Sequence, residues 1–333
     1  MRALIALIVV VAVLASAAAG TMLWENGHFN AAGPGATETT VRIRQGSSVR
    51  LLAENLETAG VVDSAFLFRV GVLRRGAQAR LKAGEYAFPA HTSMAEAMDR
   101  LVRHDVVEHR ITIAEGLTSD MALDIVKADP VLEGEASAVP EGKLLPETYL
   151  FEWGTTRAEM LSRMRRAQET LLAELWPKRK EGLPIQTQEE AITLASIVEK
   201  ETGVPSERPR IAAVFVNRLK SGMKLESDPT IIYGLTKGMP LGHPLRQSEL
   251  AAPNPYSTYQ IAGLPPTPIA NPGRAAIAAV LNPPESNEIF FVANGTGGHA
   301  FADTIQEHER NVAAWRRLER DRAASQSETP RLR

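Results

Sequence analysis

The N-terminal segment restricts the fold of this chain more than any other stretch of its sequence. From Ala3 to Leu23 there is no charged residue, and most positions are Ala, Val, Leu or Ile. A run of this length can cross a bilayer as an α-helix. Trp24 stands at the place of an interface anchor. Arg2 is the only basic residue before the run and Glu25 follows it, which favours a cytoplasmic N-terminus. We therefore expect residues 1–24 to be a single-pass transmembrane anchor, with the rest of the chain outside the cytoplasm.

A cleaved signal peptide is the alternative for this segment. Residues 15–17 (Ala-Ser-Ala) and 17–19 (Ala-Ala-Ala) both fit an A-x-A cleavage site. The apolar run continues beyond the core of a usual signal peptide, which favours the retained anchor. In either case, the chain after Trp24 is exported.

Composition narrows the class of protein without identifying it. A chain of 333 residues can bury ample core in one large domain or two smaller ones. The formal net charge of −2 and the absence of a long single-sign run give no indication of a nucleic-acid partner. Cysteine is absent, which excludes disulfides and thiolate metal sites.

A predicted helix in the second half of the chain ends in two glutamates. Thr187 and Glu190 have the spacing of a capping box, so the helix is predicted to begin there. At 3.6 residues per turn, one face carries an apolar stripe made of Ala191, Leu194, Ala195 and Val198. Glu201 falls inside this apolar arc, and Glu199 lies on its edge.

This placement indicates acid chemistry. A carboxyl group against apolar neighbours loses the solvation of its charged form, so its pKa should rise. Cleavage of a glycosidic bond requires an acid that is still protonated near neutral pH, because the leaving oxygen must receive a proton. The alternative is a solvated helix end with two surface glutamates.

Beyond the anchor, the sequence predicts an α+β protein in several segments. Residues 25–38 are rich in Gly, Ala, Asn and Thr and predict a tether. Residues 39–114 show a strand–turn–helix order that recurs at 110–126, which is the layout of glycan-binding LysM-like modules; ordinary α+β elements are the alternative. A connecting helical region, a larger mixed α+β catalytic domain and a disordered tail are expected at 115–183, 184–322 and 323–333.

Serine residues are expected to cap two further helices. Ser93 precedes a predicted helix at 94–103. Ser206 is expected to cap a helix that carries Ile211, Val214, Phe215 and Leu219 and ends near Gly222.

Several segments spread over nearly the whole chain have a specific order and spacing. After the anchor come LKAGEYAF at 81–88, EGKLLPETYLF at 141–151, LASIVEKETGVPSERPRIAAVFVNRL at 194–219, LESDPTIIYG at 225–234, YSTYQIAGLPPTPIANPG at 256–273 and FFVANGTGGHAFADTIQEH at 290–308. Together they resemble the endolytic murein transglycosylase (YceG-like) family. Three residues depart from the family pattern: Glu147 replaces a usual Asp, Thr267 a frequent Gly, and Glu288 a common aromatic residue. These departures bear on substrate contacts and leave the glutamate motif intact.

The resemblance implies a lyase that cleaves the bond between N-acetylmuramic acid and N-acetylglucosamine in nascent peptidoglycan. One glutamate protonates the leaving oxygen and then deprotonates the C6 hydroxyl, which closes a 1,6-anhydro ring and ends strand growth. One carboxylate therefore suffices, whereas the usual glycosidases need two. Glu201, followed by Thr202, is similar to the Glu-Ser pair of lysozyme-like transglycosylases and is assigned the catalytic role. Glu199 is the runner-up or a supporting acid, and no cofactor is implied.

The resemblance also implies a location and partners. It places the chain in the cell inner membrane, with the catalytic domain in the periplasm. The substrate is the glycan strand of peptidoglycan, and the expected protein partners are peptidoglycan synthases of the penicillin-binding type.

Other polar residues carried by the matching motifs are candidate substrate contacts or supporting groups. They are Glu147, Tyr149, Asn217, Glu226, Ser227, Asp228, Thr230 and Tyr233. Turn chemistry and capping are the alternative, because Asp228 before Pro229 is a natural turn residue. Tyr149, Tyr256 and Tyr259 are expected either to stack on sugar rings or to belong to the core. His299 and His308 lack the compact ligand set of a metal site, so no metal is expected.

Two other functions remain open at this point. A lysozyme-type hydrolase would need a carboxylate opposite Glu201 to activate water, and Asp228 is the best candidate. A non-catalytic peptidoglycan-binding scaffold would use the LysM-like region alone, but it would have no need of the glutamate motif.

Overall fold

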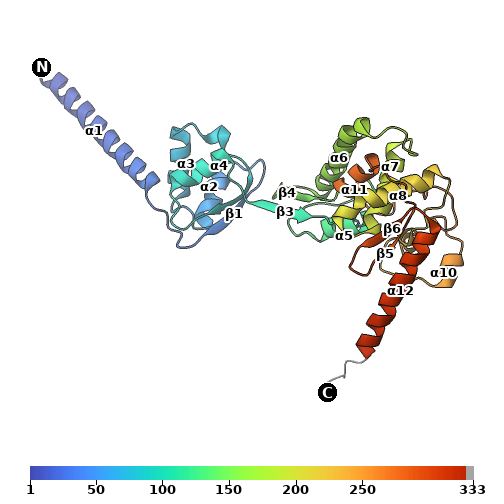
Figure 1. The fold of residues 1–333 in the computed structure, drawn as a ribbon. Coiled ribbons are helices and arrows are strands. Elements are labelled where there is room, and N and C mark those ends of the chain that lie inside the picture. The colour runs from blue at the N-terminus through green and yellow to red at the C-terminus, as the bar shows by residue number, and fades with distance from the viewer. Residues whose placement is uncertain (328–333) are drawn as a thin grey trace. The chain divides into compact units, whose positions relative to one another are not determined.

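The computed structural model describes residues 1–327, which form two compact units of mixed helix and strand (Figure 1). Unit 1 contains Met1–Arg110, Val131–Glu133 and Leu150–Thr155. Unit 2 contains Ile111–Pro130, Gly134–Tyr149 and the chain from Thr156 onward. Strands β3 (Glu108–Thr112) and β4 (Thr148–Glu152) pair with each other, and the boundary between the units runs through both. The α+β class expected from the sequence is confirmed.

Unit 1 begins with the apolar helix α1 (Arg2–Asn30), which is long and apolar enough to cross a membrane. Strands β1 (Thr39–Ile43) and β2 (Gly84–Phe88) pair antiparallel, with Val41 opposite Tyr86. Their buried side chains share one hydrophobic core with the helices of the unit. These helices are α2 (Val49–Thr58), α3 (Ala65–Arg74) and α4 (Met94–Arg103), and a 3₁₀ turn, η1 (Gln78–Arg80), precedes β2.

The tether expected at 25–38 is wrong for its first residues, because α1 continues to Asn30. Phe29 is buried against α3 at Gly71, where any Cβ would collide with the Phe29 ring. The Arg75 guanidinium lies over the Phe29 ring, 3.9 Å from its centroid, and Arg74 forms an ion pair with Glu25. Packing against α3 therefore extends the helix beyond the apolar run that the sequence displays.

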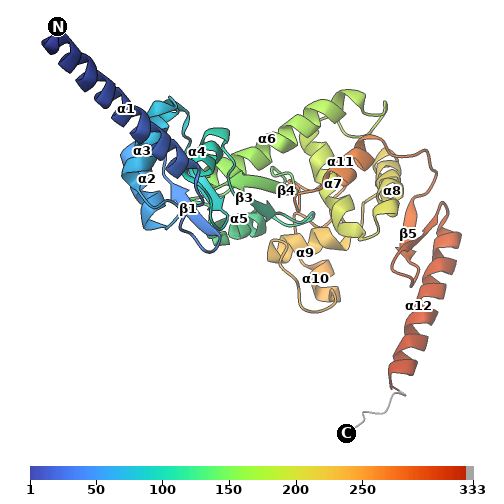
Figure 2. The ribbon, with the colours of Figure 1, turned by 90° about the vertical axis from the view of Figure 1, so that its left-hand side faces the viewer.

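Unit 2 contains the helices around which the site is built. Its elements after β3 are α5 (Ser119–Ala128), β4, α6 (Arg157–Leu175), η2 (Trp176–Lys178), α7 (Gln188–Glu201), η3 (Pro205–Glu207), α8 (Arg208–Lys220), α9 (Asp228–Thr236), α10 (Gln247–Ala251), α11 (Arg274–Leu281), β5 (Phe290–Ala293), β6 (His299–Ala302) and α12 (Ile305–Ser327). Helices α7, α8 and α11 pack against one another around a core that includes Leu194, Phe215 and Ile277 (Figures 1 and 2). β5 and β6 form an antiparallel hairpin.

Residues 115–183, expected to connect two domains, pack largely into unit 2. Leu145 and Leu171 belong to the same hydrophobic core as α7 and α8. The Asn271 side chain bridges the region: its Nδ2 donates to the Leu117 carbonyl at 3.1 Å, and its Oδ1 accepts from Leu144 N at 3.0 Å. These contacts join segments more than a hundred residues apart, so local sequence patterns do not reveal them.

Six helices of the described chain begin at a side chain that bonds the first turn of the helix. The capping side chains accept a bond from the backbone N–H three residues on, which satisfies a donor that the helix leaves unpaired; they are Ser48, Ser64, Ser93, Thr118, Thr156 and Thr187. The capping box of Thr187 and Glu190 is confirmed. The expected cap at Ser206 is wrong, because Ser206 lies within η3 and α8 continues directly from that turn. Pro209 at the start of α8 has no N–H that needs a partner.

The C-terminal tail differs from its prediction where the structure describes it. Helix α12 runs to Ser327, so residues 323–327 are helical, not disordered. The remainder of the predicted tail, 328–333, lies outside the described residues. The other domain boundaries stay a prediction.

Candidate active site

Glu201 is the last residue of α7, and its carboxyl group faces Ser227 at the start of α9. The Ser227 hydroxyl donates a hydrogen bond of 2.8 Å to Glu201 Oε2. Ser227 occupies the N-cap position of α9, but its side chain makes no cap bond there. Serine at this position usually caps its own helix. Because the Ser227 hydroxyl bonds Glu201 instead, it holds the Glu201 carboxyl group in one rotamer.

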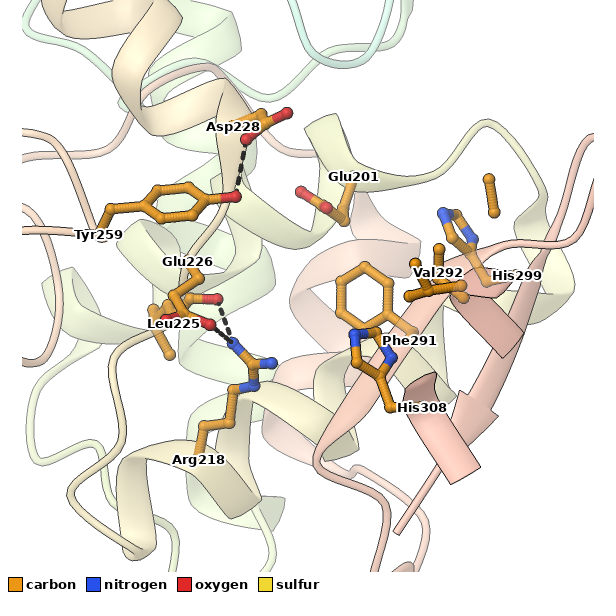
Figure 3. A pocket seen from close by; sticks show the side chains of 12 residues that line it. Glu201, Arg218, Leu225, Glu226, Asp228, Tyr259, Phe291, Val292, His299 and His308 are labelled. Carbon is orange, nitrogen blue, oxygen red and sulfur yellow. Dashed lines mark hydrogen bonds and ion pairs between the residues drawn. The ribbon is translucent and has the colours of Figure 1, made fainter. Parts of the chain in front are cut away.

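A cleft of about 350 Å³ opens beside Glu201 (Figure 3). Both polar and aromatic groups line it, and they come from α7, α8, α9, β5, β6, α12 and two loops: Glu201, Arg218, Leu225, Glu226, Asp228, Tyr259, Phe291, Val292, Ala293, His299, His308 and Val312. All belong to unit 2. The cleft size is in the range of small-molecule sites and is sufficient for part of an oligosaccharide.

The surroundings of Glu201 favour its neutral form. Burial raises the pKa of its carboxyl group to about 7, with a smaller contribution from the negative charge of Asp228; the Ser227 hydrogen bond and Arg218 act in the opposite direction. The position of Glu201 at the C-terminus of α7, where unpaired carbonyl groups point, also disfavours a negative charge. Near neutral pH, this carboxyl group can therefore donate a proton and accept one later.

Hydrogen bonds with Thr258 and Thr230 fix the segment that carries Ser227. Ser227 N donates to Thr258 Oγ1 at 2.9 Å, and Thr230 Oγ1 donates to the Ser227 carbonyl at 2.6 Å. Glu226 has a φ of 52°, a left-handed conformation that costs about 1–2 kcal/mol for a residue with a side chain. Backbone strain of this kind persists where neighbouring contacts dictate the conformation, often at functional sites.

Arg218 forms the floor of the cleft on the α8 side. Its Nε donates to the Ile289 carbonyl at 2.6 Å, and Nη1 donates to the Leu225 carbonyl at 2.9 Å and pairs with Glu226 at 3.2 Å. The guanidinium thereby ties α8 to the segment before α9 and to the start of β5. On the opposite wall, Tyr259 donates a hydrogen bond of 2.8 Å to Asp228 Oδ1, as Figure 3 shows. Burial is the main reason that the pKa of Tyr259 lies above its ordinary value, so the phenol remains a donor.

The structure brings four of the candidates from the sequence together: Glu201, Glu226 and Asp228 line the cleft, and Ser227 contacts Glu201. Tyr259, considered for sugar stacking, also lines it. Thr230 lies one step behind, fully buried, where it supports Ser227.

The remaining candidates have structural contacts away from the cleft. Glu199 turns to the other side of α7, where it accepts a hydrogen bond from Gly273 N at 3.0 Å and pairs with Arg208 at 2.8 Å. Asn217 does not reach the cleft as expected, because its Nδ2 donates to the Ser286 and Glu288 carbonyls at 2.7 and 3.0 Å. The other three also lie elsewhere: Tyr149 donates to the Leu145 carbonyl, Tyr233 donates to Glu141, and Glu147 lies 3.6 Å from Arg274.

The sequence reasoning missed Arg218 and Phe291 as cleft residues. A signal for Arg218 was present: it follows Val214 by four residues and Phe215 by three, so a charged residue occupies the apolar stripe of α8. A buried arginine at such a position needs nearby acceptors, which indicates a polar site. Phe291 carries no comparable signal, because an apolar residue in a short strand is ordinarily core.

Comparisons with known proteins find relatives of this chain. Residues 41–314 match the model of the YceG-like family. A protein of Streptococcus pneumoniae serotype 2 (strain D39), named endolytic murein transglycosylase, is 28% identical over 324 residues, which is 82% of this chain and 58% of that protein. A Bacillus subtilis (strain 168) protein of the same name is 33% identical over 172 residues, 51% of this chain and 46% of that protein. The chain thus spans about half to three-fifths of the length of these relatives.

A crystal structure of a yceG-like protein from Listeria monocytogenes resembles the fold, with a TM-score of 0.50 and 28% sequence identity. The alignment covers 83% of this chain and 99% of the Listeria chain.

Proposed function

The chain belongs to the YceG-like family, and on this premise we propose that it is an endolytic peptidoglycan transglycosylase. It cleaves the bond between N-acetylmuramic acid and N-acetylglucosamine inside nascent strands and leaves 1,6-anhydro ends. The relatives named endolytic murein transglycosylase support this proposal. The observation that carries it is the carboxyl group of Glu201, which lies in the cleft with its pKa raised to about 7 by burial.

In this mechanism, Glu201 performs both proton transfers. The neutral carboxyl group donates its proton to the glycosidic oxygen, and the bond from C1 of the muramic sugar to this oxygen breaks through an oxocarbenium-like state. The Glu201 carboxylate then accepts the proton of the C6 hydroxyl as O6 bonds to C1. This second step restores the neutral acid, so no water is consumed. Ser227 keeps the carboxyl group in place through both steps.

The second candidate function is a lysozyme-type hydrolase, because a second carboxyl group, that of Asp228, lines the same cleft. A hydrolase would require Asp228 to activate water or to stabilise the sugar cation. Its Oδ1 already accepts the Tyr259 hydrogen bond, which supports a role in shaping the cleft wall.

Product analysis separates the two functions. Digestion of purified glycan strands by the intact protein should yield internal fragments that end in 1,6-anhydro-N-acetylmuramic acid, which are 18 Da lighter than hydrolysis products, the mass of one water. Mass spectrometry of the fragments measures this difference. Fragments with reducing ends would identify a hydrolase, and intact strands would favour the non-catalytic scaffold.

The proposal extends to location and to unit 1. Helix α1 would anchor the protein in the inner membrane, with its N-terminus in the cytoplasm and unit 2 in the periplasm, beside a peptidoglycan synthase of the penicillin-binding type. In unit 1, the pair of strands β1 and β2 packed with α2 and α3 supports a LysM-like module that binds glycan strands.

Two deletions test these assignments. Removal of residues 1–24 should move the protein from the membrane to the soluble fraction and leave unit 1 folded, because Glu25 and Phe29 keep their contacts with α3. Removal of residues 39–107 should weaken strand binding in a pull-down more than it lowers turnover at saturating substrate. If the protein without residues 1–24 still sediments with membranes, the anchor is contradicted. If the protein without residues 39–107 binds glycan strands as well as the parent, the LysM-like role is contradicted.

A further inference from the structure

His299, at the start of β6, lines the same cleft as Glu201 and is held in a fixed orientation (Figure 3). Its backbone N donates to Glu207 Oε1 at 2.8 Å, and its Nδ1 lies 2.8 Å from Glu207 Oε2. A carboxylate can only accept here, so Nδ1 carries the hydrogen. The ring also packs edge-on against Phe291, with 5.3 Å between the ring centroids. No described residue hydrogen-bonds the remaining nitrogen, Nε2.

The Glu207 carboxylate is also held in one position by hydrogen bonds. It accepts a third hydrogen bond, of 3.2 Å, from the hydroxyl of Thr202, the residue directly after Glu201. Burial opposes ionisation of Glu207, but the hydrogen bonds from His299 and Thr202 outweigh it and keep the pKa below its ordinary value. A Cβ at Gly298 would lie only 2.4 Å from Glu207 Oε1, so a glycine is needed for this approach. Glu207 thus connects the end of the catalytic helix with the His299 imidazole.

Most other polar groups of the cleft are engaged with protein partners. Arg218 is bound by backbone carbonyls and Glu226, and Asp228 accepts the Tyr259 hydrogen bond. His308 stacks on Phe290, 5.0 Å between centroids, and its Nδ1 is buried without a partner among the described residues. Nε2 of His299 is therefore a side-chain acceptor that a ligand in the cleft can reach.

We propose that His299 contacts the glycan strand, with Nε2 accepting a hydrogen bond from a sugar hydroxyl or N-acetyl N–H, and that Glu207 is the positioning residue that presents it. This inference rests on the proposed function, because it takes the substrate to be a glycan. Amino sugars carry such donors on every ring, and an imidazole whose Nδ1 carries the hydrogen has Nε2 as its acceptor.

The binding test uses the intact protein with Glu201→Gln, in which slowed turnover leaves the glycan strands largely uncut during the measurement. In this background, His299→Asn should weaken the binding of purified glycan strands roughly 2- to 15-fold, the value of one neutral hydrogen bond. Asparagine is the informative choice because its Nδ2 can replace Nδ1 as donor to Glu207, whereas nothing replaces Nε2. His243→Asn is the matched control, since His243 pairs with Glu249 away from the cleft.

The split between KM and kcat separates substrate contact from a structural role. In the parent background, His299→Asn should raise KM for glycan strands by about the factor by which it weakens binding, and it should leave kcat nearly unchanged. Glu207→Gln should change KM in the same direction, because an amide cannot accept all three hydrogen bonds that the Glu207 carboxylate accepts.

If the affinity and the KM of His299→Asn equal those of the parent, the inference is overturned. If His299→Asn lowers the thermal unfolding midpoint so far that unfolded protein explains the whole loss of binding, the inference is also overturned and the role of His299 is structural. These outcomes are independent of the product analysis. If the parent released reducing ends, the transglycosylase proposal would fail, while the binding comparison would still decide whether His299 contacts the strand.

Discussion

Glu201→Gln should lower the release of anhydro fragments from glycan strands by roughly 10²–10⁴-fold, the range of general acid–base catalysis. Glutamine can still accept the Ser227 hydrogen bond, so the geometry of the α7 end is preserved. It has no proton to give to the leaving oxygen and cannot serve as the base for the C6 hydroxyl. The initial rate of fragment release, measured by mass spectrometry, gives the size of the loss.

Glu189→Gln on the same helix is the matched control. The Glu189 side chain is 71% exposed and forms a surface pair with Lys143, so its replacement should leave turnover within about twofold of the parent. Undiminished anhydro-product formation by Glu201→Gln would exclude Glu201 as the acid.

The pH dependence of the parent and of Glu201→Gln follows from the raised pKa of Glu201. Activity should fall above about pH 7, as the carboxyl group loses the proton that it must donate. For stability, the folded-state pKa of about 7 exceeds the ordinary value of 4.5, so the unfolded state ionises first as the pH rises between these values. The parent is therefore progressively destabilised across this window, and Glu201→Gln is not. The thermal unfolding midpoint of Glu201→Gln should therefore rise relative to that of the parent between pH 4 and pH 8.

Glu199→Gln should destabilise the fold by roughly 3–5 kcal/mol, the cost of removing one partner of a buried ion pair. The Glu199 and Arg208 side chains are only 3% and 11% exposed, and the substitution leaves the guanidinium with the half-exposed Glu115 as its remaining carboxylate. Urea unfolding measures the loss in the free energy of unfolding. Because Glu199 does not line the cleft, turnover per folded molecule should remain close to that of the parent.

The same Glu189→Gln variant controls for this stability measurement, since a surface pair contributes at most about 1 kcal/mol. A Glu199→Gln protein that unfolds like the parent but has lost turnover would reverse the roles assigned to the two glutamates.

The starts of α7 in the site and α4 in unit 1 could be predicted because their signals are local. Thr187 and Glu190 cap α7, and Ser93 caps α4, through bonds that span three residues. The apolar stripe of α7 is likewise a property of neighbouring turns, and it placed Glu201 on the buried side. The prediction failed at Phe29 and at residues 115–183, where packing against distant segments decides what is helical and which core a segment joins.

The sequence by itself determined the family, the apolar helix and the two carboxylates at the end of α7. The pattern placed Glu201 inside the apolar arc and Glu199 on its edge, but it did not show which groups surround either carboxyl group. Only the tertiary structure shows these surroundings, and they support Glu201 as the acid of the proposed reaction. Arg208 and Gly273 N, from other elements, bind Glu199 away from the cleft, whereas Glu201 meets the hydroxyl of Ser227, the like charge of Asp228 and the opposite charge of Arg218. The pKa of a buried carboxyl group depends on the charges and donors around it in space. For Glu201 the tertiary fold supplies these groups from other elements, such as Ser227, 26 residues further along the chain.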